Sequence, residues 1–201
     1  AMAVVYDKEE LVDYFREQVP EKPEHPILID KFLEHAVEVD VDALSDGKEV
    51  YVAGIMEHIE EAGIHSGDSA CVLPSFSLSY DHVALIAAQA EALARELKVV
   101  GLMNIQFAIK GDDLYILEVN PRASRTAPFV SKATGVPLPY MATQVMLGKT
   151  LDELDTWSMR RGGFTCVKEA VLPFQRFPGV DIILGRGMHT TGEVMGMRID
   201  F

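Results

Sequence analysis

Four polar side chains recur at alternate positions in two neighbouring apolar runs of this sequence. Asn104 and Gln106 lie in LMNIQFAI at 102–109, while Glu118 and Asn120 lie in the run that ends in LEVN. Side chains two apart in a strand point to the same face, so each pair is expected to share a face. Carboxylate and amide oxygens suit magnesium or manganese. The spacing therefore predicts a divalent-metal site; the alternative is that these residues are only the solvent face of an amphipathic hairpin.

Two arginines follow this hairpin. Arg122 and Arg125 come after Pro121, which ends the second strand. Guanidinium groups bind phosphate and carboxylate in a bidentate manner. A lone arginine here would be interpreted as a surface residue, but beside a metal site the two predict a clamp for a phosphoryl group or an acid. The combination indicates a site for a metal–nucleotide complex with an anchor for an acid group.

The site requires one particular hairpin register. The segment 110–113 between the two runs, KGDD, is typical of a tight turn. A three-residue loop at 111–113 would pair Lys110 with Leu114 and place Gln106 opposite Glu118. A two-residue loop would shift the pairing by one residue and is expected to put Gln106 and Glu118 on opposite faces. The three-residue loop is therefore predicted.

The elements that must position this hairpin are mostly short strands. Strands are predicted at 1–6, 27–33, 36–44, 49–59 and 167–174. Helices are predicted at 7–18 and 79–98, and a turn at 131–139 precedes a third helix that runs through about 147. In 36–44, valines alternate with Glu38, Asp40 and Asp42, which indicates a half-buried strand with an acidic outer face. The pattern predicts an α+β fold with an antiparallel sheet and flanking helices.

Composition and charge narrow the function classes. The 201 residues are 48% hydrophobic, enough for one domain or two small subdomains, and the net charge of −13 argues against nonspecific binding to nucleic acid or anionic membranes. No apolar run approaches the length of a membrane span. Cys71, Cys166 and the six histidines lack paired or metal-type spacing, so neither a disulfide framework nor a zinc site is predicted. Without a basic and apolar leader, a cytoplasmic location is expected.

Other segments give weaker signals of nucleotide binding. The loop at 63–69 contains ordinary turn formers, or else lets backbone N–H groups approach a nucleotide. Glu38 is a surface residue by its spacing, or else a carboxylate that accepts ribose hydroxyls. Two glycine motifs fail: Thr143 stands where the P-loop ending at 148–150 needs its first glycine, and Thr190 replaces the third glycine of a dinucleotide fingerprint at 185–190.

Longer strings resemble a known family. EVNPR after a strand, with a glutamine twelve residues before the glutamate, resembles the metal hairpin of ATP-grasp ligases. Nearly the whole chain is similar to the large subunits of carbamoyl-phosphate synthetases, on the strings DKFLEHAVEVDVDAL (30–44), MEHIEEAGIHSGDSACVLP (56–74), MNIQFAI (103–109), EVNPRASRTAPFVSKATGVPLP (118–139) and KEAVLPFQRFPGVDIILGRGMHTTGEVMG (168–196). HSGDSACVLP and RTAPFVSKATGVP resemble the second of the two ATP-grasp halves of that subunit, the half that phosphorylates carbamate to carbamoyl phosphate.

The resemblance implies a role for each matching position. The Mg²⁺ or Mn²⁺ ions that bridge the ATP phosphates would be held by Gln106, Glu118 and Asn120, of which Gln106 and Glu118 would also contact ATP. Adenine would be bordered by Lys31 and Leu33, the ribose would be bound by Glu38, and the nucleotide loop would be formed by Gly63, Ile64, His65 and Ser66. The transferring phosphoryl group or the carbamate would be stabilised by Arg125, with Arg122 as its neighbour.

The resemblance also implies an organisation and a context. Residues 1–60 would belong to the smaller ATP-grasp subdomain and 61–201 to the larger one, with a further subdomain upstream and an allosteric domain downstream. The implied partners are carbamate or carbamoyl phosphate, the rest of the large subunit and a glutamine amidotransferase small subunit, in pyrimidine and arginine biosynthesis. The alternatives are another ATP-grasp ligase that activates a carboxylate, such as a biotin-carboxylase-like protein, and an inert segment that serves only as an interaction module.

Overall fold

The computed structural model describes residues 3–20, 26–158, 163–176, 179, 182–185 and 187–199. The chain divides into two compact units, Ala1–Glu34 and His35–Phe201, and each is described by itself. The assignment of 1–60 and 61–201 to two subdomains stays a prediction.

The first unit is built around helix α1 (Lys8–Gln18). The Asp7 side chain accepts hydrogen bonds from the backbone N–H groups of Glu9 and Glu10, at 2.8 and 2.9 Å, and so satisfies two free donors of the first turn. The predicted helix start is confirmed. The strands predicted at 1–6 and 27–33 are wrong for the described residues, because 3–6 and 27–33 pair with no other strand. A β-rich composition forms a strand only where a neighbour accepts its hydrogen bonds.

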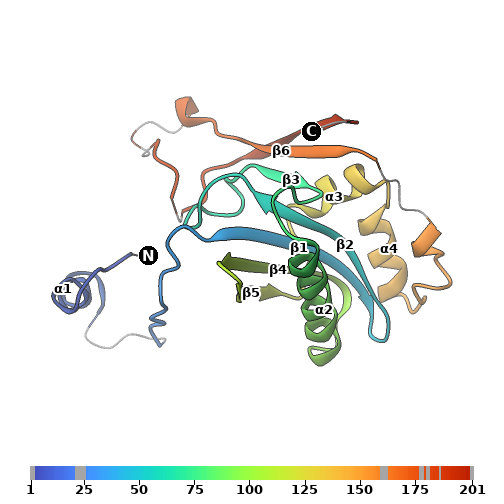
Figure 1. Ribbon diagram of the computed structural model, residues 1–201, viewed down its shortest axis with the longest axis horizontal. Coiled ribbons are helices and arrows are strands. Elements are labelled where there is room, and N and C mark those ends of the chain that lie inside the picture. The colour runs from blue at the N-terminus through green and yellow to red at the C-terminus, as the bar shows by residue number, and fades with distance from the viewer. Residues whose placement is uncertain are drawn as a thin grey trace. The chain divides into compact units, whose positions relative to one another are not determined.

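The second unit contains one antiparallel sheet in the order β5-β4-β1-β2-β3-β6-β7 (Figure 1). Its strands are β1 (Val37–Asp46), β2 (Val50–His58), β3 (Cys71–Leu73), β4 (Val100–Lys110), β5 (Asp113–Asn120), β6 (Thr165–Val171) and β7 (Gly192–Arg198). Its helices are α2 (Tyr80–Glu96), α3 (Ala127–Thr134) and α4 (Leu138–Met146), with 3-10 turns η1 (Thr156–Ser158) and η2 (Phe174–Arg176). The predicted α+β class with flanking helices is confirmed.

Three elements of this unit were missed in the sequence. Strand β3 lies in 63–74, a segment whose small and polar residues indicated a loop, and β7 lies in the glycine- and proline-rich segment after residue 174, where no strand was predicted. The second half of α3 lies in the predicted turn at 131–139. Helix α3 ends at Gly135, whose φ of +75° is a left-handed conformation that glycine adopts readily. Among the described helices, none has the length and apolar character needed to cross a membrane.

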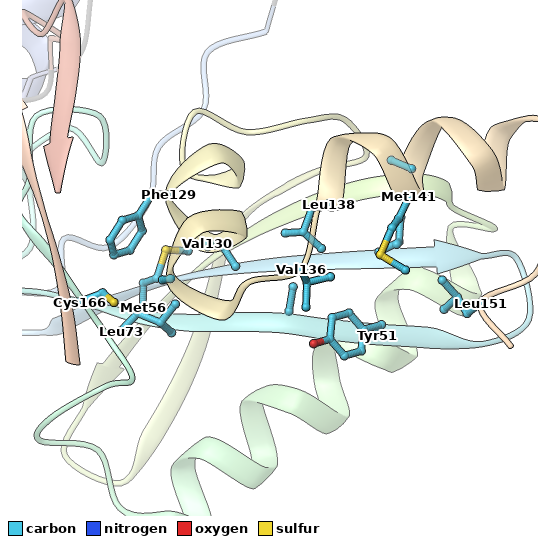
Figure 2. Close-up of a cluster of buried hydrophobic side chains, with 14 of the residues drawn as sticks. Tyr51, Met56, Leu73, Phe129, Val130, Val136, Leu138, Met141, Leu151 and Cys166 are labelled. Carbon is cyan, nitrogen blue, oxygen red and sulfur yellow. The ribbon is translucent and has the colours of Figure 1, made fainter. Parts of the chain in front are cut away.

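The two faces of the sheet are covered by different helices (Figure 1). On one face, Val39 and Val41 of β1 and Phe107 of β4 form a buried core with Ile86 and Ala90 of α2. On the other face, a second core joins β2, β3 and β6 to α3 and α4, as Figure 2 shows for Met56, Leu73, Val130, Leu138 and Cys166. The central strands are therefore buried on both sides along most of their length.

The acidic face of β1 is one of these buried faces. Asp40 and Asp42 are each 2% exposed, so the predicted acidic outer face is wrong. They point to the side of the sheet that carries α3 and α4, because the alternate residues Val39 and Val41 face α2. Buried carboxylates need hydrogen-bond or ion-pair partners, so other polar side chains must lie next to Asp40 and Asp42 on that face of the sheet.

The β4–β5 hairpin has the predicted pairing of Gln106 with Glu118, but its loop is shorter than predicted. Lys110 pairs with Asp113, so the loop has two residues and the predicted three-residue loop is wrong. Gly111, with φ of +64°, occupies the position that a type II′ turn reserves for glycine. A β-bulge between Gln106 and Phe107 leaves Leu117 as the extra residue of β5, which shifts the register back by one. Gln106 therefore pairs with Glu118 as predicted, and the expectation that a two-residue loop would separate them is wrong.

Candidate functional site

Six polar residues form two rows across strands β1, β4 and β5. In one row Asp40 pairs with Gln106 and Gln106 with Glu118. In the next row Asp42 pairs with Asn104 and Asn104 with Asn120. Residues two apart on each strand share a face, so the rows lie side by side on the face that carries α3. The four residues named from spacing thus come together, joined by two aspartates that sequence reasoning placed on the surface.

This polar face forms one wall of an open cavity of about 420 Å³. Its walls come from the two rows, the loop after β2, the loop between β5 and α3, and the segment before β7. The lining residues are Asp40, His65, Ser66, Gly67, Asn104, Gln106, Glu118, Arg122, Ala123, Ser124, Arg125, Thr126, Met188 and Glu193. Six predicted site residues therefore share one cavity, namely His65, Ser66, Gln106, Glu118, Arg122 and Arg125. Glu38, Gly63, Ile64 and Asn120 do not line it.

The loop at 63–69 is joined to both sides of the cavity. Gln106 Nε2 donates to Ser66 Oγ at 3.0 Å, which leaves the amide oxygen of Gln106 free for a cation. Lys168 of β6, which is fully buried, donates from Nζ to the Ser66 carbonyl at 3.3 Å. Its ammonium also lies 3.9 Å from Glu193 of β7. Burial raises the pKa of Glu193, and the positive charges of Lys168 and Arg125 act against this rise.

Glu38 is tied to the same loop. One of its carboxylate oxygens accepts a hydrogen bond from the Gly63 backbone at 3.1 Å, and the other lies 3.5 Å from His58 Nδ1. His58 Nε2 lies 3.2 Å from Asp40 Oδ2. Burial alone would lower the pKa of His58, but its hydrogen bonds with Asp40, Cys71 and Glu38 outweigh burial and hold that pKa well above its ordinary value. A charged His58 between two carboxylates fixes Glu38 at the loop and Asp40 at the cavity.

Cys71 lies beside this group. The ligand atoms of Asp40, His58 and Cys71 lie within 4.8 Å of one another, a juxtaposition that sequence spacing does not indicate. Both Cys71 and Cys166 are buried free thiols. Because the imidazole is already held as a cation by two carboxylates, the group is best described as an internal ion-pair network.

The donor set of the two rows fits Mg²⁺ or Mn²⁺. Gln106, Glu118 and Asn120 offer two amide oxygens and one carboxylate, all hard oxygen ligands. The buried Nδ2 of Asn120 has no hydrogen-bond partner in the described chain; this nitrogen is a donor and calls for an acceptor, so the support for a metal ion comes from the oxygen ligands alone. These three residues would hold the ion, and the ion would neutralise phosphate charge.

The remaining predicted residues lie in three places. Arg122 and Arg125 both line the cavity. The Arg122 guanidinium donates to the Ala123 carbonyl at 3.0 Å, whereas that of Arg125 makes no hydrogen bond within the described residues. Ile64 is half-buried in the loop beside Gly63. Lys31 and Leu33 belong to the first unit, so their predicted adenine contacts stay predictions.

Sequence reasoning missed Asp40, Asp42, Lys168 and Glu193. For the aspartates the signal was present, because Asp40 and Asp42 alternate with buried valines and need only a covered face to become internal. Lys168 also alternates with apolar residues in TCVKEAV, which would have predicted an inward-facing lysine had its partner strands been known. For Glu193, strand β7 itself was not foreseen.

Asp42 gives the site a pH-dependent stability. Burial raises its pKa from 3.8 to about 6, against hydrogen bonds from Thr126 that lower it. An acid whose folded pKa exceeds its unfolded value contributes stability that is complete below about 3.8 and lost as the pH rises through about 6. Over that window this one group should lower the free energy of unfolding by roughly 3 kcal/mol. Urea unfolding of the wild type and Asp42→Asn at pH 4 and pH 7 tests this: the variant should gain about that amount relative to the wild type. A pH-independent difference would contradict it.

The chain is similar to known proteins in sequence and in fold. Residues 1–154 match the family model described as carbamoyl-phosphate synthase L chain, ATP binding domain. The carbamoyl phosphate synthase large chains of Methanothermobacter thermautotrophicus and Synechocystis sp. are 57% and 59% identical over 204 and 202 residues. Each comparison covers 100% of this chain and 19% of the relative, so the chain spans about a fifth of their length. The biotin carboxylase domain of a single-chain bacterial carboxylase has a TM-score of 0.66 and 18% identity, over 85% of this chain and 45% of that one, which shows a shared ATP-grasp fold.

Proposed function

The chain belongs to the family of ATP-binding domains of the carbamoyl-phosphate synthase L chain, and on that premise we propose that it carries part of the site that phosphorylates carbamate with ATP to give carbamoyl phosphate. In this proposal the chain comes from the second ATP-grasp half of a large chain that works with a glutamine amidotransferase. The product would supply pyrimidine and arginine biosynthesis.

One observation carries the proposal. Gln106 and Glu118 stand opposite each other on a wall of the cavity whose rim holds Arg122 and Arg125. Phosphoryl transfer needs positioning and neutralisation of charge rather than a covalent nucleophile. The hard oxygen ligands supply the first counter-charge through Mg²⁺ or Mn²⁺, and the arginines supply the second. The loop with His65 and Ser66 lines the same cavity, which supports its proposed contact with the nucleotide phosphates.

The two arginines differ in their hydrogen bonds. Arg125 makes none within the described residues and would be available to the transferring phosphoryl group, whereas Arg122 donates to a carbonyl of its own loop. Glu38 is held beside the proposed nucleotide loop by Gly63 and His58, and its contact with the ribose is proposed from the family resemblance, since Glu38 does not line the cavity. In the same proposal, Lys31 and Leu33 would border the adenine ring.

Formation of ATP from carbamoyl phosphate and MgADP, the reverse of the proposed step, tests this function. The assay is run on the 201-residue chain and on the large chain of Synechocystis sp. whose matching segment is exchanged for these residues. We expect ATP formation in the exchanged large chain, and its loss in the Glu118→Ala variant.

Two further arms separate the alternatives. Replacing carbamoyl phosphate with acetyl phosphate distinguishes carbamate chemistry from a ligase for another carboxylate, which would accept the acetyl group. The family resemblance also implies that the first ATP-grasp half phosphorylates bicarbonate, so bicarbonate-dependent ATP hydrolysis by the exchanged large chain would report that this chain is folded. If this hydrolysis persists while ATP formation is absent, the proposal is wrong and the reading as an inert segment gains support.

A further inference from the structure

The loop between β5 and α3 is fastened to the interior of the sheet at a single carboxylate. Asp42 lies on β1, and both of its oxygens are taken: Oδ1 accepts from Asn104 Nδ2 at 3.1 Å and Oδ2 accepts from Thr126 Oγ1 at 2.6 Å. Asp42 and Thr126 are 84 residues apart in the chain and are 2% and 5% exposed. A short hydrogen bond from a hydroxyl to a buried carboxylate is among the stronger kinds.

Thr126 is the N-cap residue of α3 but does not cap the helix with its side chain. At this position a threonine oxygen usually accepts a hydrogen bond from the first turn, yet the Thr126 side chain makes no such bond. Ser124 takes over that task, because the Ala127 N–H donates to Ser124 Oγ at 2.9 Å. The Thr126 hydroxyl proton is directed to Asp42, and Ser124 Oγ lies 3.0 Å from Thr126 Oγ1. Against the burial that raises it, a hydrogen bond from the Ser124 side chain also lowers the pKa of Asp42, so the hydroxyls on both sides of residue 125 are tied to that carboxylate.

Arg125 is the residue between these two hydroxyls. It lines the cavity and makes no hydrogen bond within the described chain, and the charge of Glu193 on the same cavity attracts it without fixing it by a hydrogen bond. Its direction is then set by the backbone at 124–126. That backbone is held from both neighbours by the two hydroxyls that are tied to Asp42.

We propose that Asp42, acting through the Thr126 hydroxyl, is a positioning residue that holds Arg125 toward the transferring phosphoryl group. The inference rests on the proposed function for the role of Arg125, but the fastening of the loop does not. Small displacements of a positioned group cost rate steeply, up to about 100-fold for 1 Å. Loss of the hydrogen bond between Thr126 and Asp42 should therefore lower kcat and leave the affinity for the nucleotide unchanged.

Three threonine variants test the fastening in the protein alone. Thr126→Val keeps the shape and removes the hydroxyl, while Thr126→Ser keeps the hydroxyl. Thr134→Val is the matched control, since Thr134 is 6% exposed in the same helix and donates to the Val130 carbonyl at 2.8 Å. The measurement is amide hydrogen exchange of the peptide covering 121–127. We expect at least about 10-fold faster exchange there in Thr126→Val, and wild-type rates in Thr126→Ser and Thr134→Val. Wild-type rates in Thr126→Val, or equal acceleration in Thr134→Val, would overturn the inference.

Turnover in the exchanged large chain tests the link to Arg125. Thr126→Val should lower kcat for ATP formation about 10- to 100-fold and leave the KM for MgADP unchanged, with Thr126→Ser restoring the rate. In an Arg125→Ala background, Thr126→Val should cause no further loss, because nothing remains to be positioned. Additive losses would overturn the positioning role. If the wild-type protein forms no ATP while the exchange pattern holds, the proposed function fails and the fastening stands.

Discussion

Glu118→Gln should lose more than about 1,000-fold of the rate of ATP formation from carbamoyl phosphate and MgADP. The substitution preserves shape and one oxygen donor but removes the only carboxylate among the three proposed metal ligands on the β4–β5 hairpin. Loss of one fixed charge in such a site typically costs about 100- to 1,000-fold, and here it would also weaken the binding of the ion. The expected loss is therefore larger than for any single arginine.

Asp113→Asn is the matched control for this change. Asp113 begins the same strand, is exposed, and loses the same charge on substitution, but pairs with Lys110 at the far end of the hairpin. It should retain wild-type activity. Direct Mn²⁺ binding in the presence of ADP, followed by electron paramagnetic resonance, gives a second readout: affinity should fall in Glu118→Gln and not in Asp113→Asn. Unchanged Mn²⁺ affinity in Glu118→Gln would remove Glu118 from the proposed ligand set.

The hairpin shows what can and cannot be predicted from the sequence. Alternation predicted that Asn104, Gln106, Glu118 and Asn120 share a face, and the pairing of Gln106 with Glu118 is confirmed. The predicted three-residue loop was wrong, because Gly111 readily adopts the positive φ that a two-residue turn needs. The bulge at Leu117 then shifts the register by one residue and brings Gln106 opposite Glu118. Whether a bulge forms depends on how two strands pair and on what packs over them, so neither strand's sequence alone predicts it.

The buried aspartates show a second limit. A period of two establishes that Asp40 and Asp42 oppose the valines, but not which of the two faces meets solvent. That depends on α3 and α4, of which α3 was interpreted as a turn. Strand β7 was missed for a related reason: its glycines have low strand propensity, and pairing with β6 determines its conformation. Long-range pairing, rather than local preference, decided each of these elements.

These buried acids also explain how an acidic chain can build an anion site. Asp40 is matched by His58, and Asp42 by donors from Asn104 and Thr126, so their charges are used inside the protein. Within the described residues Arg125 makes no hydrogen bond, so its guanidinium is available to an anion in the proposed site. The cavity lining also carries Asp40, Glu118 and Glu193, so a bound cation would be needed beside the two arginines to offset the charge of a polyphosphate.

Arg125→Ala should lower kcat for ATP formation about 100- to 1,000-fold, because the transferring group would lose a charge that is already in place. The affinity for MgADP should change little, since Ser66, Gln106 and Glu118 remain at the proposed nucleotide and metal positions. Arg125→Lys should recover only part of the rate, because an ammonium cannot reproduce the planar fork of a guanidinium. Arg95→Ala, on the helix that covers the opposite face, serves as the control. Calorimetry with MgADP and steady-state kinetics separate binding from turnover; an equal loss in both would show that Arg125 binds the ground state and does not favour the transition state.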